Sequence, residues 1–196
     1  MMGPVPPTVQ DLAWPVTTDR LSLRPAVASD AEAVWRYRRL PAVAEWMTAL
    51  PGELDRYAAQ FAEPDRLRVT LVVEQDGAVV GDLMLRVEDA WAQTEVAADA
   101  VATQAELGWA FDPAHHGRGL ATEATRRLVA LCFADLGLRR VTAGCFADNA
   151  PSWRLMERLG MRREGTFRAE SLHRSGRWLD SFTYALLREE WVAARA

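Results

Sequence analysis

Residues 106–122, ELGWAFDPAHHGRGLAT, decide the fold. The apolar run over residues 105–111 predicts a strand, which Asp112-Pro113 closes. The two glycines that follow, Gly117 and Gly119, allow a tight backbone path into a helix whose first N–H groups lack internal partners and carry partial positive charge. This order of strand, glycine loop and helix suits a diphosphate. Apolar residues at helical spacing extend the helix to about Leu136: Leu120, Ala124, Leu128 and Leu131.

Several kinds of loop share these features. A Walker loop needs a lysine beside its last glycine, and the chain contains no lysine. A dinucleotide fingerprint is met at Gly117 and Gly119 but has Thr122 in its last place, and no acidic residue clearly ends the next strand. An ordinary glycine-rich turn is an equal alternative from this stretch alone, so the rest of the chain must decide.

Alternation and helical spacing predict the other elements. A helix over 29–40 has a capping-box spacing, with Ser29 as the cap and Glu32 three residues later. The order of elements predicts a mixed sheet flanked by helices, an α/β or α+β fold, with an extended arm over 1–17 and a single domain over 18–196. The remaining elements are a strand at 21–24, helices within 41–51 and 53–61, a hairpin of 68–74 and 78–87, an inserted loop at 88–104, a strand at 140–146, a helix at 149–159, and a hairpin of 163–171 and 178–187.

Composition narrows the class of protein. The chain has 196 residues, 49% hydrophobic and 26% charged, which is typical of one globular domain. No apolar run reaches the roughly 20 residues that span a bilayer, and the first residues lack a secretory pattern. Two cysteines, Cys132 and Cys145, make no disulfide framework, so we expect a cytoplasmic protein. The net charge of −4 disfavours nucleic acid as a partner.

Several motifs, taken in order, resemble one family. Residues 106–109 together with 116–124 resemble the GNAT superfamily of acyl-CoA-dependent N-acyltransferases. Residues 149–152 (NAPS) and 157–161 (ERLGM) resemble the second signature of that superfamily. The opening TDRLSLR at 18–24 and the tail at 176–191 are similar to its ribosomal-protein alanine and serine N-acetyltransferase-like branch. The resemblance covers roughly residues 18–191.

The resemblance implies a mostly antiparallel central sheet of about seven strands, the acyl-CoA N-acyltransferase fold. A V-shaped opening between strands 105–111 and 140–146 would hold the pantetheine arm, and the amides of the glycine loop would hold the diphosphate. Acetyl-CoA is the implied co-substrate, with no metal. The implied cofactor-binding residues are Trp109, Ala110, Phe111, Gly117, Arg118, Gly119, Leu120, Ala121, Thr122, Asn149 and Ser152.

Two positions depart from the family pattern. His116 stands where Gln or Arg is usual, which weakens side-chain help to the phosphates but leaves the backbone amides intact. Met156 stands where many members carry the tyrosine that protonates the leaving thiolate. That acid must be replaced, by Ser152 or a water, or be unnecessary, since a thiol with a pKa near 8.5 already leaves tolerably as a thiolate.

The implied catalytic residues are Glu106, Asn149 and Ser152. Glu106 is the candidate base, acting through a water on the attacking amine; equally, it is a strand-end carboxylate satisfied by a neighbouring arginine. Asn149 and Ser152 would serve the thioester, or would only cap the helix that follows.

Candidate acceptor residues are Trp35, Trp46 and Glu106, although core packing explains the tryptophans as well. Residues 87–117 contain no arginine but six acidic residues, which would attract a cationic or amino-terminal acceptor if they lie near the site. A solvated acidic loop is the plainer explanation. Arg126 and Arg127 could reach a cofactor 3′-phosphate or form a solvated face. His115 and His116 lack partners at metal-ligand spacing.

The sequence therefore predicts an acetyl-CoA-dependent N-acetyltransferase. It would act by direct attack in a ternary complex on a primary amine, either a protein N-terminus or a small amine. A homodimer is compatible with this prediction, whereas nucleic acid and membrane are not expected partners. A non-catalytic acyl-CoA-binding module is the alternative, because of Met156, and a nucleotide-dependent oxidoreductase is a distant third.

Overall fold

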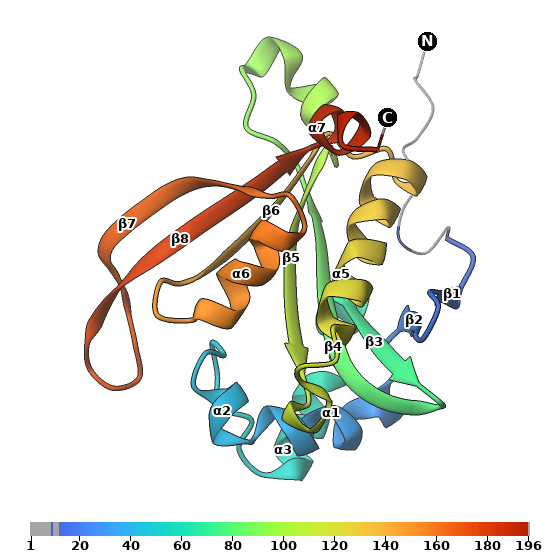
Figure 1. The fold of residues 1–196 in the computed structure, drawn as a ribbon, viewed down its shortest axis with the longest axis vertical. Helices are drawn as coiled ribbons and strands as arrows, with labels where there is room; N and C mark the ends of the chain where they lie inside the picture. The colour runs from blue at the N-terminus through green and yellow to red at the C-terminus, as the bar shows by residue number, and fades with distance from the viewer. Residues whose placement is uncertain (1–8, 10–11, 196) are drawn as a thin grey trace.

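The computed structural model describes residue 9 and residues 12–195, in which eight strands form one twisted sheet in the order β1-β2-β3-β4-β5-β6-β8-β7 (Figure 1). All neighbours are antiparallel except β5 and β6, which confirms the expected mixed, mostly antiparallel sheet. The strands are β1 (Val16–Thr17), β2 (Ser22–Pro25), β3 (Thr70–Gln75), β4 (Ala78–Glu88), β5 (Gln104–Phe111), β6 (Arg140–Phe146), β7 (Arg162–Leu172) and β8 (Trp178–Leu187).

The strand beyond the expected seven is β1, which pairs with Ser22 and Leu23 of β2. Its two residues end the segment 1–17 that was expected to be an extended arm. Most of that arm, residues 1–8 and 10–11, lies outside the described residues.

The described residues also contain seven α-helices and four short turns of other helix types; all but α7, which follows β8, lie between strands. The α-helices are α1 (Ala31–Arg38), α2 (Pro41–Ala44), α3 (Leu54–Phe61), α4 (Pro64–Val69), α5 (Leu120–Ala130), α6 (Ala150–Arg158) and α7 (Arg188–Ala193). The 3-10 turns are η2 (Ala28–Asp30), η3 (Thr94–Ala100) and η4 (Pro113–His115), and η5 (Leu131–Asp135) is a π-helical turn that continues α5.

Two local predictions are wrong. The Ser29 cap is replaced by Asp30, whose buried carboxylate accepts a hydrogen bond of 2.8 Å from the N–H of Val27 and is held by Arg24. The strand expected from Arg68 begins at Thr70 instead, because Pro64 starts an extra helix, α4, that runs to Val69. Proline favours the first turn of a helix, where its missing N–H costs nothing.

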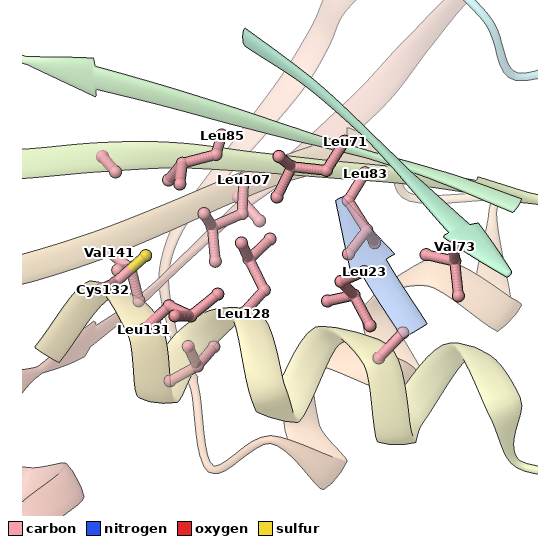
Figure 2. Close-up of a cluster of buried hydrophobic side chains, with 14 of the residues drawn as sticks. Leu23, Leu71, Val73, Leu83, Leu85, Leu107, Leu128, Leu131, Cys132 and Val141 are labelled. Carbon is pink, nitrogen blue, oxygen red and sulfur yellow. The ribbon is translucent and has the colours of Figure 1, made fainter. Parts of the chain in front are cut away.

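Two hydrophobic clusters cover the two faces of the sheet. On one face, α5 packs on the inner side chains of β2 to β6, as Figure 2 shows for Leu128. The predicted stripe is fully buried: Leu120, Ala124, Leu128 and Leu131. Burial of each such leucine contributes about 1.5–3 kcal/mol. On the other face, α1 and α3 pack against Val72 of β3 and Ala110 of β5. The end of β5 is therefore clamped between helices.

A buried polar contact fixes α1 to the sheet. The Tyr37 hydroxyl donates to Asp82 Oδ1 at 2.5 Å and the Arg38 Nε donates to the same oxygen at 2.9 Å. Burial, followed by the nearby Asp82 charge, raises the pKa of Tyr37. Asp82 pairs in register with Ala110, so this contact braces the end of β5.

The strands β5 and β6 separate soon after they meet. They pair only from Gln104↔Arg140 to Glu106↔Thr142, although β5 continues to Phe111 and β6 to Phe146. The far side of β6 remains paired with β8 along its length. The expected V-shaped opening between these strands is present. No helix in residue 9 or residues 12–195 has the length and apolar character to cross a bilayer.

Candidate active site

A cavity of about 890 Å³ lies where β5 and β6 separate. One end is formed by the glycine loop, Gly117–Gly119, with the start of α5. The other is formed by the turn after α2. Residues from both ends, from α6 and from the segment before β2 line it: Asp19, Arg20, Ala42, Val43, Trp46, Met47, Trp109, Ala110, Phe111, His115, His116, Gly117, Gly119, Leu120, Ala121, Thr122, Glu123, Arg126, Asn149, Pro151, Ser152, Leu155 and Arg158.

The glycine loop adopts a conformation that only glycine takes readily. Gly117 and Gly119 have φ of 74° and 76°, in the left-handed region. Gly119 is the N-cap of α5 and offers no capping side chain. Within the described residues, the N–H groups of Leu120, Ala121 and Thr122 find no acceptor, so they are free to bind an anion.

Arginines add positive charge to this end of the cavity. Arg126 and Arg158 line it, and the Arg158 Nε lies 3.4 Å from the Thr122 hydroxyl. Arg20 lines it too and forms an ion pair with Glu123 at 2.5 Å. Three guanidinium groups and free amide N–H groups form a donor set that fits the diphosphate and phosphate of a CoA molecule.

The two neighbouring arginines of α5 have different surroundings. Arg126 lines the cavity, whereas Arg127 lies 3.7 Å from Asp135 and does not. Arg158 was missed by the sequence interpretation, although it belongs to the ERLGM motif at the end of α6. The sequence offers no reason to single out this arginine as a ligand-binding residue, because arginines at helix C-termini are also favoured by the helix dipole alone.

Asn149 and Ser152 stand together at the start of α6, on the cavity wall. Asn149 occupies the N-cap position, but its side chain makes no capping hydrogen bond to the described residues. Ser152 lies near the Cys145 thiol of β6, and burial raises the pKa of that thiol. The amide of Asn149 therefore remains available to a ligand.

Glu106 lies at the last paired position of β5 and β6, opposite Thr142, where the two strands begin to separate. Its Oε2 lies 2.8 Å from Nη1 of Arg86, and its side chain is 39% exposed. It is not among the residues that line the cavity. In this structure the Glu106 carboxylate is therefore paired with a neighbouring arginine, which is the alternative that the sequence offered to the role of base.

The side chain at position 156, where the family pattern leads us to expect a tyrosine, does not line the cavity. Met156 is fully buried in the core, and none of the described residues lining the cavity is a tyrosine. The hydroxyl groups that do line it belong to Thr122 and Ser152.

Aromatic side chains gather at the other end of the cavity. Trp46 lines it, with its ring centroid 6.0 Å from that of Phe146 and 5.7 Å from that of His173. The Ser175 N–H donates to His173 Nδ1 at 3.2 Å, so Nε2 carries the proton and donates to the Glu45 carbonyl at 3.1 Å. We call Trp46, Phe146 and His173 the aromatic end.

Other predicted residues lie elsewhere. Trp35 donates through Nε1 to the Gly52 carbonyl at 2.9 Å, stacks under Arg39 and does not line the cavity. The Arg118 side chain turns toward His115 Nδ1 at 3.4 Å. No acidic residue of 87–117 lines the cavity, and η3, which carries part of that charge, lies at the opposite end of β5 from the glycine loop (Figure 1).

His115 and His116 line the cavity but gather no further ligands. His116 Nε2 lies 3.2 Å from the Phe111 carbonyl. Within the part of the chain that the structure describes, no three His, Cys, Asp or Glu side chains come together as a metal site would require. Both cysteines are free.

Comparison with known proteins identifies relatives over most of the chain. The family model described as an acetyltransferase (GNAT) domain matches residues 20–162. The uncharacterized N-acetyltransferase YnaD of Bacillus subtilis (strain 168) is 32% identical over 177 residues, which cover 90% of this chain and 98% of YnaD.

Solved structures agree with this match. A GNAT-family acetyltransferase from Bacillus anthracis has a TM-score of 0.74 and 28% identity, over 89% of this chain and 99% of that one. RimJ of Mycobacterium smegmatis, solved in complex with CoA-disulfide, has a TM-score of 0.68 and 23% identity, over 89% of both chains. The second likeness concerns the fold alone.

Proposed function

Since the chain belongs to the GNAT family of acetyltransferases, we propose that it acetylates a primary amine, a protein N-terminus or a small amine, by direct attack in a ternary complex with acetyl-CoA. The observation that carries the proposal is the glycine loop, which presents unpaired N–H groups to a cavity where β5 and β6 separate. We place this reaction in the cytoplasm, in keeping with the free cysteines.

Different residues would bind different parts of acetyl-CoA. The N–H groups from Gly119 to Thr122 would bind the diphosphate, and Arg126 and Arg158 the 3′-phosphate of the nucleotide. The pantetheine arm would follow the inner edges of β5 and β6, from Phe111 toward Glu106. The bound cofactor would supply the activated acetyl thioester, and the chain supplies its orientation.

The proton balance defines what the side chains must do. Acetyl transfer forms a C–N bond and breaks a C–S bond. Starting from the ammonium, the nitrogen loses two protons: one goes to a base before the attack, and the other leaves the tetrahedral intermediate and reaches the departing thiolate. At pH 7, deprotonation costs about 1.4 kcal/mol for an α-amine and about 4.6 kcal/mol for a lysine side chain. The proposed base for the first proton is Glu106, acting through a water. Its register position, opposite Thr142 where β5 and β6 begin to separate, supports this role. Its carboxylate must release Arg86 to act, because the two form an ion pair outside the cavity lining.

Asn149 and Ser152 act at the thioester end. The free amide of Asn149 orients the pantetheine arm, and Ser152, next to Cys145, lies at the cavity wall where the thiolate would leave. No tyrosine is required there, because the thiolate is a tolerable leaving group near neutral pH.

The aromatic end receives the acceptor. Trp46 offers a ring face, and an ammonium over a tryptophan gains about 0.5–2 kcal/mol. Attraction by the acidic residues of 87–117 is not part of this proposal, since none of them lines the cavity.

The test is thiol release from acetyl-CoA with a panel of amines, alongside calorimetric binding of CoA. We expect release with at least one cationic amine and a fall of about a hundredfold in kcat for Glu106→Gln. Measurable CoA binding without release for any amine would instead establish the second candidate, a non-catalytic acyl-CoA-binding module, which the buried Met156 favours.

A further inference from the structure

We infer that Arg20, with Thr18 and Glu123, is a positioning device that holds the glycine loop ready for the diphosphate. We call these three residues the Arg20 clamp. The inference rests on the proposed function and extends it to a segment, before β2, that lies about a hundred positions away in the sequence from the loop.

The clamp converges on the carboxylate of Glu123, in the first turn of α5. The Thr18 hydroxyl donates to Oε1 at 2.5 Å and the Arg20 backbone N–H donates to the same oxygen at 3.1 Å. The Arg20 Nε donates to Oε2 at 2.7 Å. Both carboxylate oxygens are thus occupied, and the segment before β2 is fastened to the start of α5.

The same arginine also holds the glycine loop directly. Its Nη1 donates to the Arg118 carbonyl at 3.0 Å. The Arg118 carbonyl and the Gly119 N–H belong to one planar peptide unit and point in opposite directions, so fixing the carbonyl fixes the N–H. With φ of 76° at Gly119, this contact stabilises the left-handed turn that leads into α5.

Charge gives the clamp a second role. Burial acts to raise the pKa of Glu123, but hydrogen bonds from Thr18 and Arg20 outweigh it and lower that pKa. Glu123 is therefore an anion on the wall of a cavity that must accept a diphosphate, and Arg20 neutralises it. The Arg20 guanidinium uses one N–H of Nε and one of Nη2 on Glu123 and one N–H of Nη1 on the Arg118 carbonyl, which leaves two of its five N–H groups for the ligand.

The experiment compares a thioester that has the diphosphate with one that lacks it. For Arg20→Ala we expect about a tenfold or greater loss in CoA affinity by calorimetry and a matching rise in KM for acetyl-CoA, with kcat retained. With S-acetyl-pantetheine, which has no diphosphate, kcat/KM should stay within about twofold of wild type.

Two further variants separate charge from geometry. Thr18→Ala removes one neutral bond and should cost about threefold in CoA affinity. In Arg20→Ala/Glu123→Gln the unpaired anion is gone, so part of the affinity lost in Arg20→Ala should return. Arg140→Ala is the control, because it breaks another arginine–glutamate pair, with Glu164, and neither residue lines the cavity.

Two results would overturn the clamp as a positioning device. One is an equal loss of kcat/KM with both thioesters in Arg20→Ala, and the other is the same CoA affinity in Arg20→Ala and Arg140→Ala. A wild-type protein that binds CoA but releases no thiol would overturn the proposed function alone. The calorimetric comparison of CoA affinities still tests the clamp in that case.

Discussion

The two ends of the cavity are built in different ways. At the glycine-loop end, the groups that face the cavity are backbone N–H groups and arginines. Two glycines with positive φ and the ion pair of Arg20 with Glu123 hold this end in place. At the aromatic end the Trp46 side chain faces the cavity. Two other segments support it through ring contacts with Phe146 and His173 and through the hydrogen bond from His173 to the Glu45 carbonyl. One end is set by backbone conformation and the other by the choice of side chains.

This difference indicates which end determines specificity. Backbone amides recognise an anionic group and not the rest of the ligand. The glycine-loop end therefore suits a co-substrate that does not vary, and it does not distinguish one acceptor from another. The aromatic end can change its shape by single substitutions without disturbing a strand or helix. We therefore expect substitutions at the two ends to affect different kinetic constants.

The largest effect should come from Gly119→Val. A β-branched residue at φ of 76° is strained by about 1–3 kcal/mol, and relief of that strain moves the N–H groups at the start of α5. The only described atom near the added Cβ is Arg20 Nη2 at 3.7 Å, so the backbone, not a clash, is the cause. CoA binding by calorimetry should weaken by about a hundredfold or more.

The matched control is Gly137→Val. Gly137 also has a left-handed φ, 67°, with open space around it, but it lies outside the cavity. Both variants should lose thermal stability, and only Gly119→Val should lose CoA affinity. Similar CoA affinities in the two variants would contradict the proposal that backbone N–H groups of the glycine loop bind CoA.

The same difference explains what could be predicted from the sequence. The glycine-loop end comes from one continuous stretch, in which strand, turn and helix signals lie within residues 106–122, and the structure places that stretch on the cavity. The helix stripe was predictable for the same local reason, whereas the separation of β5 and β6 was expected only from the family resemblance.

The aromatic end could not be predicted in that way. His173 and Glu45 are 128 positions apart, and no local pattern says that the β7–β8 turn returns to the turn after α2. The Arg20 clamp was hidden similarly, because Thr18 and Glu123 meet only in the folded chain. Trp35 and Trp46 belong to neighbouring predicted helices, and only the fold shows that Trp46, and not Trp35, lines the cavity.

A smaller effect is expected from the arginines that face the nucleotide. Arg158→Ala and Arg126→Ala should each weaken CoA binding about tenfold but change binding of 3′-dephospho-CoA little, since a charge-assisted bond to the 3′-phosphate is lost. Arg127→Ala, whose partner is Asp135, is the control and should bind both ligands as wild type does. Equal losses for the two ligands would remove the 3′-phosphate assignment.

At the aromatic end, Trp46→Ala should raise KM for the acceptor about fivefold and leave KM for acetyl-CoA within about twofold. His173→Ala should do the same less strongly, because it loosens the turn that supports Trp46. Trp91→Ala removes a tryptophan that is 90% exposed and not on the cavity, so both constants should be unchanged. A rise in KM for acetyl-CoA alone would reverse the assignment of the two ends.

The smallest effect at the glycine-loop end should come from His116→Ala. His116 lines the cavity beside the glycine loop, and its Nε2 lies 3.2 Å from the Phe111 carbonyl. If that end binds through the backbone, removal of the imidazole leaves Gly117, Gly119 and the N–H groups of α5 in place. CoA affinity should then change by about twofold or less. A His116→Ala protein that no longer binds CoA, beside a Gly119→Val protein that does, would show that side chains build both ends.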